Sequence, residues 1–350
     1  MSPVQQELAI ALVKIVVLMG ALLGLFSGMT LAERRILAFM QFRLGPNRTG
    51  PFGLLQPVAD GIKLFFKEEL MPEGASSWPF FGAPVVAIFC AFTAVAVIPY
   101  GPAFHLPTMS FLPEWLGWLN GLEIVPQIAD PDVGLLFIFA INALSVYAIV
   151  LAGWAANSKF SLLGGLRSSA QMFSYELALG LSWVGIIMLA GSFKVTDIVN
   201  AQVGWFWHWN LVLQFPAFLV YLIAGTAEVG RIPFDLPEGE TELVAGFHTE
   251  YSSMKFALIQ MAEYVNMITV GVLVVHLFLG GWHFGIPGVP PSIVWFLLKL
   301  GALLFFFIWL RGTLPRFRYD QLMDLGWKVL IPVTALNILV TAGMVAFFSR

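Results

Sequence analysis

A membrane-spanning fold is indicated most directly by residues 256–280, FALIQMAEYVNMITVGVLVVHLFLG. A helix needs about 20 mostly apolar residues to cross the hydrocarbon core of a bilayer, and this run is long enough. It also contains the acid Glu263. A carboxylate inside a membrane is costly, so it is a candidate for function by default. The stretch therefore predicts a transmembrane helix with a buried carboxylate in it.

Seven further apolar runs of similar length predict an all-α polytopic membrane protein with eight transmembrane helices. The predicted helices cover residues 9–32, 79–99, 133–155, 168–191, 211–229, 256–280, 291–311 and 328–348. The composition agrees, because 59% hydrophobic and only 11% charged residues give more apolar surface than one soluble core can bury. We expect a single transmembrane domain over residues 1–350.

The basic residues predict the orientation of this domain. Most of the 18 Lys and Arg residues follow the first, third, fifth and seventh runs. The positive-inside rule places those stretches in the cytoplasm and both termini outside, with a bacterial inner membrane as the simplest setting. The formal net charge of −3 argues against nucleic-acid binding, which needs clustered surplus positive charge.

Residues 54–69, LLQPVADGIKLFFKEE, are too polar to span a membrane but have helical periodicity. One face carries Leu54, Val58, Ile62, Phe65 and Phe66, and the opposite face carries Gln56, Asp60, Lys63 and Lys67. This pattern predicts an amphipathic helix on the cytoplasmic surface of the membrane. The alternative is an ordinary solvated helix that covers a neighbouring element.

The acidic residues suggest a proton path. Glu176 and Glu263 each lie eight or nine residues past a cytoplasmic basic residue, a depth of roughly 12–14 Å at the helical rise. Glu228 lies near the cytoplasmic end of the fifth run. A cytoplasmic acidic loop, residues 230–255, follows it and contains Asp235, Glu238, Glu240, Glu242 and Glu250. Carboxylates this close cannot all ionise cheaply in a low dielectric, so we expect them to share and pass protons.

Other polar groups and plainer interpretations also follow from the sequence. Lys299 lies too deep in the seventh run to reach water fully, so a buried counter-charge and a place in the proton path are expected. Asn142 and Asn266 are polar groups near mid-membrane.

The acids also have a plainer interpretation without a proton path. Glu228 and Arg231 would then form a helix-end ion pair, and the loop acids would form a solvated turn.

The chain offers no evident redox or catalytic centre of its own. Cys90 is the only cysteine, which excludes an intramolecular disulfide and a cysteine-ligated iron–sulfur cluster. His248 and His276 lack metal-ligand spacing, and no nucleotide-binding or hydrolase motif occurs. We expect no catalytic residue, metal or bound cofactor in this chain, so any redox centre lies on a partner.

Four segments carry a more specific signal. They are residues 33–69, 167–176 (RSSAQMFSYE), 227–251 (AEVGRIPFDLPEGETELVAGFHTEY) and 311–332 (RGTLPRFRYDQLMDLGWKVLIP). In this order they closely resemble the H-subunit family of respiratory complex I, the proton-pumping NADH:quinone oxidoreductase. Ser252 and Ser253 stand where many members have a serine-glycine pair.

The resemblance implies a membrane subunit at the junction between the redox arm and the pumping arm, without catalytic activity alone. The first and third cytoplasmic loops and the surface helix would form part of a quinone chamber for ubiquinone or menaquinone. Its wall and its polar groups would come from Phe39, Phe42, Phe52, Phe65, Phe66, Arg34, Arg43, Asp60 and Arg231. NADH, FMN and iron–sulfur clusters would be bound by partner subunits.

The same resemblance implies how the acids work. Glu176, Glu228 and Glu263 would form a path from the chamber toward antiporter-like and small membrane subunits, and the acidic loop would move during quinone reduction. Membrane-bound hydrogenases and ferredoxin- or F420-linked relatives carry a similar subunit and are the alternative. A stand-alone ion transporter is disfavoured because the chain shows no internal repeat. A purely structural anchor leaves Glu176 and Glu263 without a role.

Overall fold

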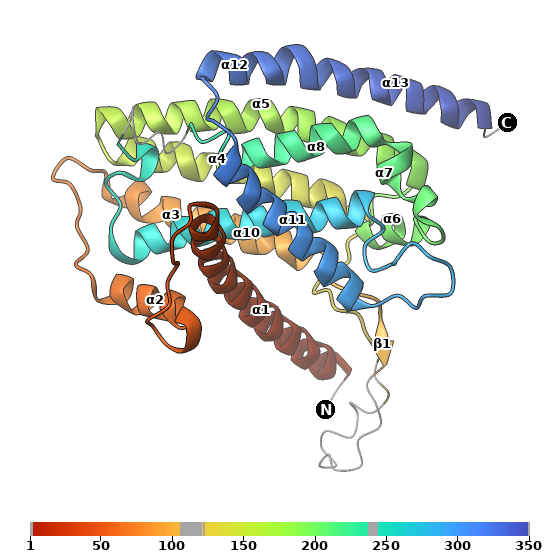
Figure 1. Ribbon diagram of the computed structural model, residues 1–350, viewed down its shortest axis with the longest axis horizontal. Coiled ribbons are helices and arrows are strands. Elements are labelled where there is room, and N and C mark those ends of the chain that lie inside the picture. Colours follow the sequence, from red (N-terminus) through yellow and green to blue (C-terminus); the bar gives the residue numbers. More distant parts are fainter. Residues whose placement is uncertain (1–2, 106–120, 122, 237–243, 349–350) are drawn as a thin grey trace.

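The computed structural model describes residues 3–105, 121, 123–236 and 244–348, and within them it is almost entirely helical (Figure 1). Seven of these helices are long and apolar enough to cross a membrane. They are α1 (Pro3–Met40), α3 (Ser77–Ala96), α4 (Gly134–Ala155), α5 (Lys159–Ala190), α10 (Ser253–Phe278), α11 (Ile293–Thr313) and α13 (Ile331–Phe348), the last extended at its start by α12 (Tyr319–Asp324) and a π-helical turn, Leu325–Leu330.

The fifth predicted span is a broken helix. α7 (Asn210–Leu213) and α8 (Phe215–Glu228) are separated by Gln214, whose backbone is not helical (φ −124°, ψ 41°). At 1.5 Å per residue, the 14 residues of α8 extend about 21 Å, less than the hydrocarbon core of a bilayer. The prediction of eight full-length spans is therefore not confirmed, while the mostly helical membrane architecture is.

Side chains from other helices stabilise the break. The Gln214 amide donates to Thr341 Oγ1 (2.8 Å) and accepts from Asn337 Nδ2 (2.5 Å), both on α13. Asn210 Nδ2 donates to the carbonyl of Leu277 on α10 (2.8 Å). The backbone at the break is itself satisfied, since the Gln214 amide donates to the Asn210 carbonyl (2.7 Å) and the Phe218 amide donates to the Gln214 carbonyl (2.9 Å).

Shorter elements connect the long helices. They are the 3-10 turn η1 (Pro51–Gly53), the surface helix α2 (Gln56–Phe66), α6 (Val195–Ala201), the turns η3 (Phe206–His208) and η4 (Gly246–His248), and two antiparallel strands, β1 (Phe104–His105) and β2 (Glu123–Ile124). α2 falls inside the predicted surface segment 54–69 and confirms that a helix forms there.

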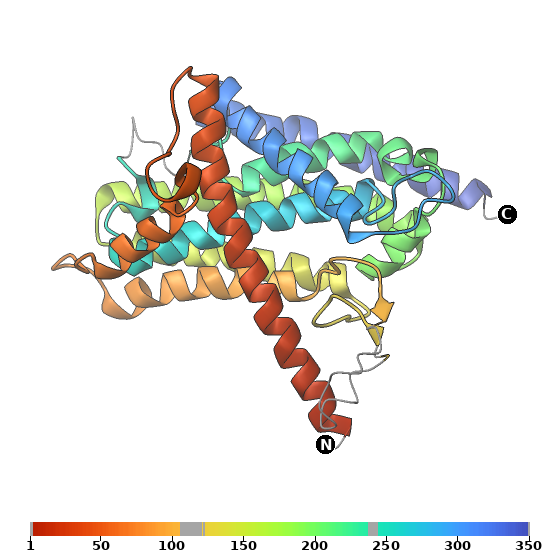
Figure 2. The same ribbon diagram turned by 60° about the horizontal axis from the view of Figure 1, so that its bottom comes forward.

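α3, α4, α5, α8 and α10 run roughly side by side, and α13 lies along α5 at one edge (Figure 1). α1 and α11 cross this bundle obliquely, and the N-terminal half of α1 projects away from it (Figure 2). The main core lies between α5, α8 and α10, where Tyr175, Tyr221 and Phe278 are fully buried. Glu176 and Glu228, on α5 and α8, are therefore held beside this core.

The second part of the acidic loop is pressed against α5. A Cβ atom on Gly164 would lie 2.7 Å from the Cα of Gly246 in η4, so only glycine permits this approach. Ser161 Oγ donates to the carbonyl of Phe247 at 3.0 Å. These contacts fix the loop beneath the ends of α4 and α5, close to the predicted acids.

Candidate functional site

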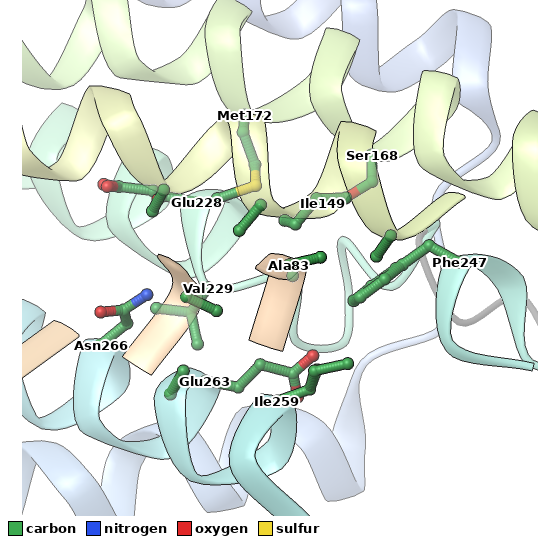
Figure 3. A pocket seen from close by; sticks show the side chains of 16 residues that line it. Ala83, Ile149, Ser168, Met172, Glu228, Val229, Phe247, Ile259, Glu263 and Asn266 are labelled. Atoms are coloured by element: carbon green, nitrogen blue, oxygen red, sulfur yellow. The ribbon is translucent and has the colours of Figure 1, made fainter. Parts of the chain in front are cut away.

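Glu228 and Glu263 line one internal cavity between α3, α4, α5, α8 and α10, with a volume of about 60 Å³ (Figure 3). Asn266, Ser145 and Ser168 add polar groups to an otherwise apolar lining. A water needs roughly 10–15 Å³ by the same measure, so the cavity has room for a few waters. The structure thus brings together two of the predicted acids and Asn266 around a space that water can fill.

Glu176 lies on α5 beside this cavity but outside its lining. Its side chain is buried. Among the described residues, Glu176 Oε1 and Glu228 Oε2 have no hydrogen-bond partner although both atoms are buried. A buried carboxylate oxygen needs a donor, which is either a water or a proton on the acid itself.

The position of Glu228 is set by Gln171 on α5. The Gln171 amide donates to the carbonyls of Ala227 (2.7 Å) and Phe234 (2.8 Å). These two bonds hold the end of α8 and the start of the acidic loop to the same side chain. The chain therefore turns directly after Glu228, and Arg231 comes to lie between α1 and α10.

Arg231 lies between two carboxylates from different helices. Its Nη1 is 3.9 Å from Glu33 Oε1 on α1, and its Nη2 is 3.9 Å from Glu263 Oε2 on α10. Its guanidinium also stacks over the Tyr264 ring, 4.5 Å from the centroid. Both ion-pair distances are too long for direct hydrogen bonds, so small movements of the guanidinium change its interaction with either acid. The plain alternative, a helix-end ion pair between Arg231 and Glu228, stays a prediction.

Glu33 is also the centre of a tighter cluster. It forms an ion pair with Arg311 at the end of α11 and accepts a hydrogen bond from the Tyr264 hydroxyl at 2.6 Å. Glu33 is buried, and a buried carboxylate is stable there only because these partners neutralise and solvate it. α1, α10 and α11 are thus joined through one side chain.

A second and larger cavity, of about 690 Å³, opens beside this cluster. Glu33, Arg34, Arg43, Asp60, Tyr264 and Arg311 are among its polar lining residues, and Phe26, Leu37, Leu44, Leu64 and Phe256 are among its apolar ones. Arg34 Nη1 pairs with Asp60 Oδ2 at 2.6 Å, which joins α1 to α2. Three of the predicted chamber residues, Arg34, Arg43 and Asp60, therefore share this cavity.

The predicted aromatic wall does not line this cavity. Phe39, Phe42, Phe52, Phe65 and Phe66 are between 67% and fully exposed, and none of them is a lining residue. The reason is the Arg34–Asp60 ion pair, which turns the polar face of α2 toward α1 and leaves its apolar face outside. In the isolated chain these side chains are exposed, and their place in a chamber wall shared with partner subunits stays a prediction.

Lys299 lies apart from the acids, near the start of α11. Its Nζ donates to the carbonyls of Leu279 (2.5 Å), Gly281 (3.1 Å) and His283 (2.5 Å) and lies 4.2 Å from the centre of the Trp209 ring. In the described part of the chain its partners are carbonyl dipoles and a ring, so the expected counter-charge is not what holds it. The structure does not bring Lys299 together with the carboxylates.

The other predicted path residues do not line either cavity or lie outside the described part of the chain. Asp235 follows Arg231 in the loop, and Glu250 follows η4; neither lines the two cavities. Asn142 on α4 also lies outside both linings. Glu238, Glu240 and Glu242 lie outside the described residues. Within the described ranges, no group of three or more His, Cys, Asp or Glu residues is arranged to hold a metal.

Comparison with known proteins decides the family. A family model described as NADH dehydrogenase matches residues 13–342. A protein of Geobacter metallireducens, named as the first H subunit of NADH-quinone oxidoreductase, is 52% identical over 97% of this chain and 98% of its own length. The chain belongs to the H-subunit family of NADH-quinone oxidoreductase. The second H subunit of Koribacter versatilis is 48% identical over 99% of both chains, and the H subunit of Paramagnetospirillum magneticum is 44% identical over 99% of this chain and 96% of its own.

Membership in the H-subunit family makes this chain one component of an enzyme complex, with the other subunits of that complex as its partners.

The sequence alone missed Glu33, Tyr264 and Arg311 as site residues. Glu33 gave a weak signal, since it lies at the end of an apolar run directly before Arg34 and Arg35. Tyr264 and Arg311 gave none, because their role depends on contacts 231 and 278 residues away in the chain.

Proposed function

We propose that this subunit forms part of the quinone-binding chamber of NADH-quinone oxidoreductase and couples quinone reduction to proton translocation. The larger cavity is the chamber part and the smaller cavity is the proton-transfer part. The observation that carries this proposal is the position of Arg231, 3.9 Å from an acid of each cavity. The names of the relatives favour a quinone enzyme over a hydrogenase-type complex.

The lining of the larger cavity suits a quinone, which has a polar head and a long apolar tail. Phe26, Leu37 and Phe256 offer apolar contacts, whereas Arg34, Asp60 and Arg311 offer hydrogen bonds and charge. The exposed phenylalanines of α2 and the preceding loop would complete the chamber together with partner subunits of the redox arm. Ubiquinone or menaquinone would enter as substrate, and its electrons would come from NADH through FMN and iron–sulfur clusters on those partners.

The coupling step is electrostatic. Reduction of a quinone to a neutral quinol takes up two electrons and two protons, and until the protons arrive the added electrons place negative charge near Glu33 and Arg311. Arg231 responds by moving toward or away from Glu33, and this movement alters the stabilisation of the Glu263 carboxylate. Waters in the smaller cavity then pass a proton between Glu263 and Glu228, and Glu176 continues the path toward antiporter-like and small membrane subunits.

The acidic loop supplies the moving element. Asp235, Glu250 and the three glutamates at 238, 240 and 242 lie in or beside it, and Arg231 is at its start. Because Gln171 holds both ends of residues 227–234, movement of the rest of the loop would reach Arg231 only by displacing this short segment. Lys299 Nζ is bound by the carbonyls of Leu279, Gly281 and His283, so we give this residue a structural role and leave it out of the proposed path.

The proposal is tested with Glu228→Gln in the intact complex in inner-membrane vesicles. We expect quinone reduction by NADH to slow and proton pumping to fall, while NADH oxidation by a water-soluble acceptor at the redox arm is unchanged. Glu123→Gln, on the exposed strand β2, is the control and leaves all three activities unchanged. Normal pumping in an assembled Glu228→Gln complex would rule out the proposed path.

A further inference from the structure

The start of α10 is joined to the surface helix α2 and the segment after it by three polar contacts. Ser253 Oγ donates to the Leu64 carbonyl of α2 at 3.0 Å, and the Leu70 amide donates to Ser252 Oγ at 3.0 Å. Lys255 Nζ pairs with Glu69 Oε1 at 2.6 Å. These six residues, here called the α2–α10 junction, connect segments that are more than 180 residues apart in the chain.

The junction contains two features that are unfavourable by themselves. Ser253 has a φ of 56°, a left-handed conformation that glycine adopts at low cost and serine does not. Lys255 places a positive charge in the first turn of α10, where the helix dipole disfavours cations. Such features persist only where the surrounding structure compensates for them, and here the compensation comes from contacts to α2 and the segment after it.

Lys255 is held especially firmly. Its side chain is buried, and its ammonium lies 3.6 Å from the centre of the Phe81 ring and 4.6 Å from that of Phe80. Tyr251, the residue before the junction, stacks on Phe80 with ring centres 4.3 Å apart. A buried ammonium needs a counter-charge, so Glu69 is kept in place by the cost of leaving Lys255 unpaired.

The junction lies directly under one wall of the larger cavity. Leu64, its contact on α2, lines that cavity together with Pro57, Asp60 and Gly61, and Phe256 and Gln260 of α10 line it from the other side. The junction therefore sets the distance and rotation of α2 relative to α10. It also closes the acidic loop, since α10 begins at Ser253.

We propose that Ser252, Ser253 and Lys255 are positioning residues, which hold α2 against α10 so that Asp60 stays in place on the wall of the quinone chamber. They also transmit movement between that wall and the end of the acidic loop. The first statement concerns the structure alone, whereas its effect on quinone turnover rests on the function proposed above.

The test uses Ser253→Gly and Lys255→Met in the intact, membrane-embedded complex. Ser253→Gly relieves the backbone strain and removes only the hydrogen bond to α2, and Lys255→Met keeps the length of the side chain without its charge. The matched control is Val244→Gly. Val244 is exposed and has a φ of 66° in the same loop, so this change relieves the same kind of strain without touching α2.

The structural readout is amide hydrogen exchange of residues 56–66. We expect exchange there to rise about fivefold for Ser253→Gly, the effect of one lost hydrogen bond, and by more for Lys255→Met, with no change for Val244→Gly. Equal exchange in all three variants and the parent complex would overturn the proposal. An equal rise in Val244→Gly would also overturn it, because loop flexibility would then be the cause.

The kinetic readout separates this inference from the proposed function. A displaced chamber wall raises the KM for quinone by a few-fold and leaves the reduction of a water-soluble acceptor unchanged. A raised KM together with faster exchange in α2 supports both proposals. Faster exchange with unchanged quinone kinetics supports the junction and contradicts the assignment of the larger cavity to quinone.

Discussion

Lys299 and Arg231 are two partly buried cations that the molecule holds in different ways. The ammonium of Lys299, near the start of α11, has three carbonyl acceptors at 2.5–3.1 Å and an aromatic ring. The guanidinium of Arg231 lies 3.9 Å from each of two carboxylates on different helices. Backbone carbonyls keep the same charge at every pH, whereas the charge of a carboxylate changes when it is protonated. The comparison therefore predicts a structural role for Lys299 and a role in coupling for Arg231.

Lys299→Met should give the largest effect and should act on stability. The carbonyls of residues 279, 281 and 283 would lose a charged donor, and a lost charge-assisted bond costs about 1.5–3 kcal/mol. We expect less assembled complex and a lower thermal midpoint in detergent. Turnover per assembled complex should change little. A large loss of turnover with normal stability would show that Lys299 belongs to the transfer path after all.

Arg231→Met should lower turnover and leave the stability of the complex largely unchanged. The methionine can still pack on the Tyr264 ring, but Glu33 and Glu263 lose the charge between them. We expect quinone-linked turnover to fall by roughly tenfold, a change of about 1.4 kcal/mol in the barrier, with most of the complex still assembled. The measurement is NADH:quinone reduction per mole of purified complex. If the complex instead failed to assemble, the two cations would have the same role.

Glu263→Gln should have a smaller effect than loss of the arginine. The glutamine keeps the shape of the cavity wall and can hydrogen-bond to water, but it cannot carry the proton. We expect pumping in vesicles to fall several-fold more than quinone reduction does. Ser145→Ala, in the same lining, is the matched control and should alter the ratio of pumping to reduction only slightly. An unchanged ratio in Glu263→Gln would argue against a proton role.

Lys194→Gln should have the smallest effect. Lys194 lies outside the spans and pairs with the exposed Asp132 at 2.9 Å. The hydrogen bond and charge of Lys194 hold the pKa of Asp132 below its ordinary 3.8. The stabilisation is therefore complete above that value and is lost as the pH falls through the lower pKa of the folded state. At pH 7 we expect a small loss of thermal stability and normal turnover, and once the pH lies below the lowered pKa of Asp132 we expect no difference from the parent chain.

Much of the fold could be predicted from apolar runs, and its exceptions have clear physical causes. The predicted helix at 256–280 matches α10 to within three residues because the run has sharp polar limits. α5 begins nine residues before its predicted start, since Lys159 and Arg167 made its first turns too polar to recognise. The break at Gln214 has a local signal in Pro216, which favours a helix start at that point, but the contacts to α13 that hold it are not visible in the sequence.

Part of the site could likewise be predicted from the sequence and part could not. The depth of Glu263 and Glu228 followed from their positions in apolar runs, and the structure places both on one cavity. The bridge through Arg231 to Glu33 could not be predicted, because it joins residues about 200 positions apart. The exposure of the α2 phenylalanines could not be predicted for a similar reason, since one distant ion pair, Arg34–Asp60, joins the polar face of α2 to α1. Their place in a quinone chamber stays a prediction.

The central claim is that Arg231 couples Glu33 to Glu263, and a double-mutant cycle tests it most directly. Glu33→Gln, Glu263→Gln and the double variant are compared by quinone-linked turnover per assembled complex, first in the parent chain and then with Arg231→Met. We predict an interaction energy of about 1 kcal/mol between the two acids in the parent chain and nearly none with the methionine. Additive effects in the parent chain, or the same interaction energy in both backgrounds, would contradict the claim.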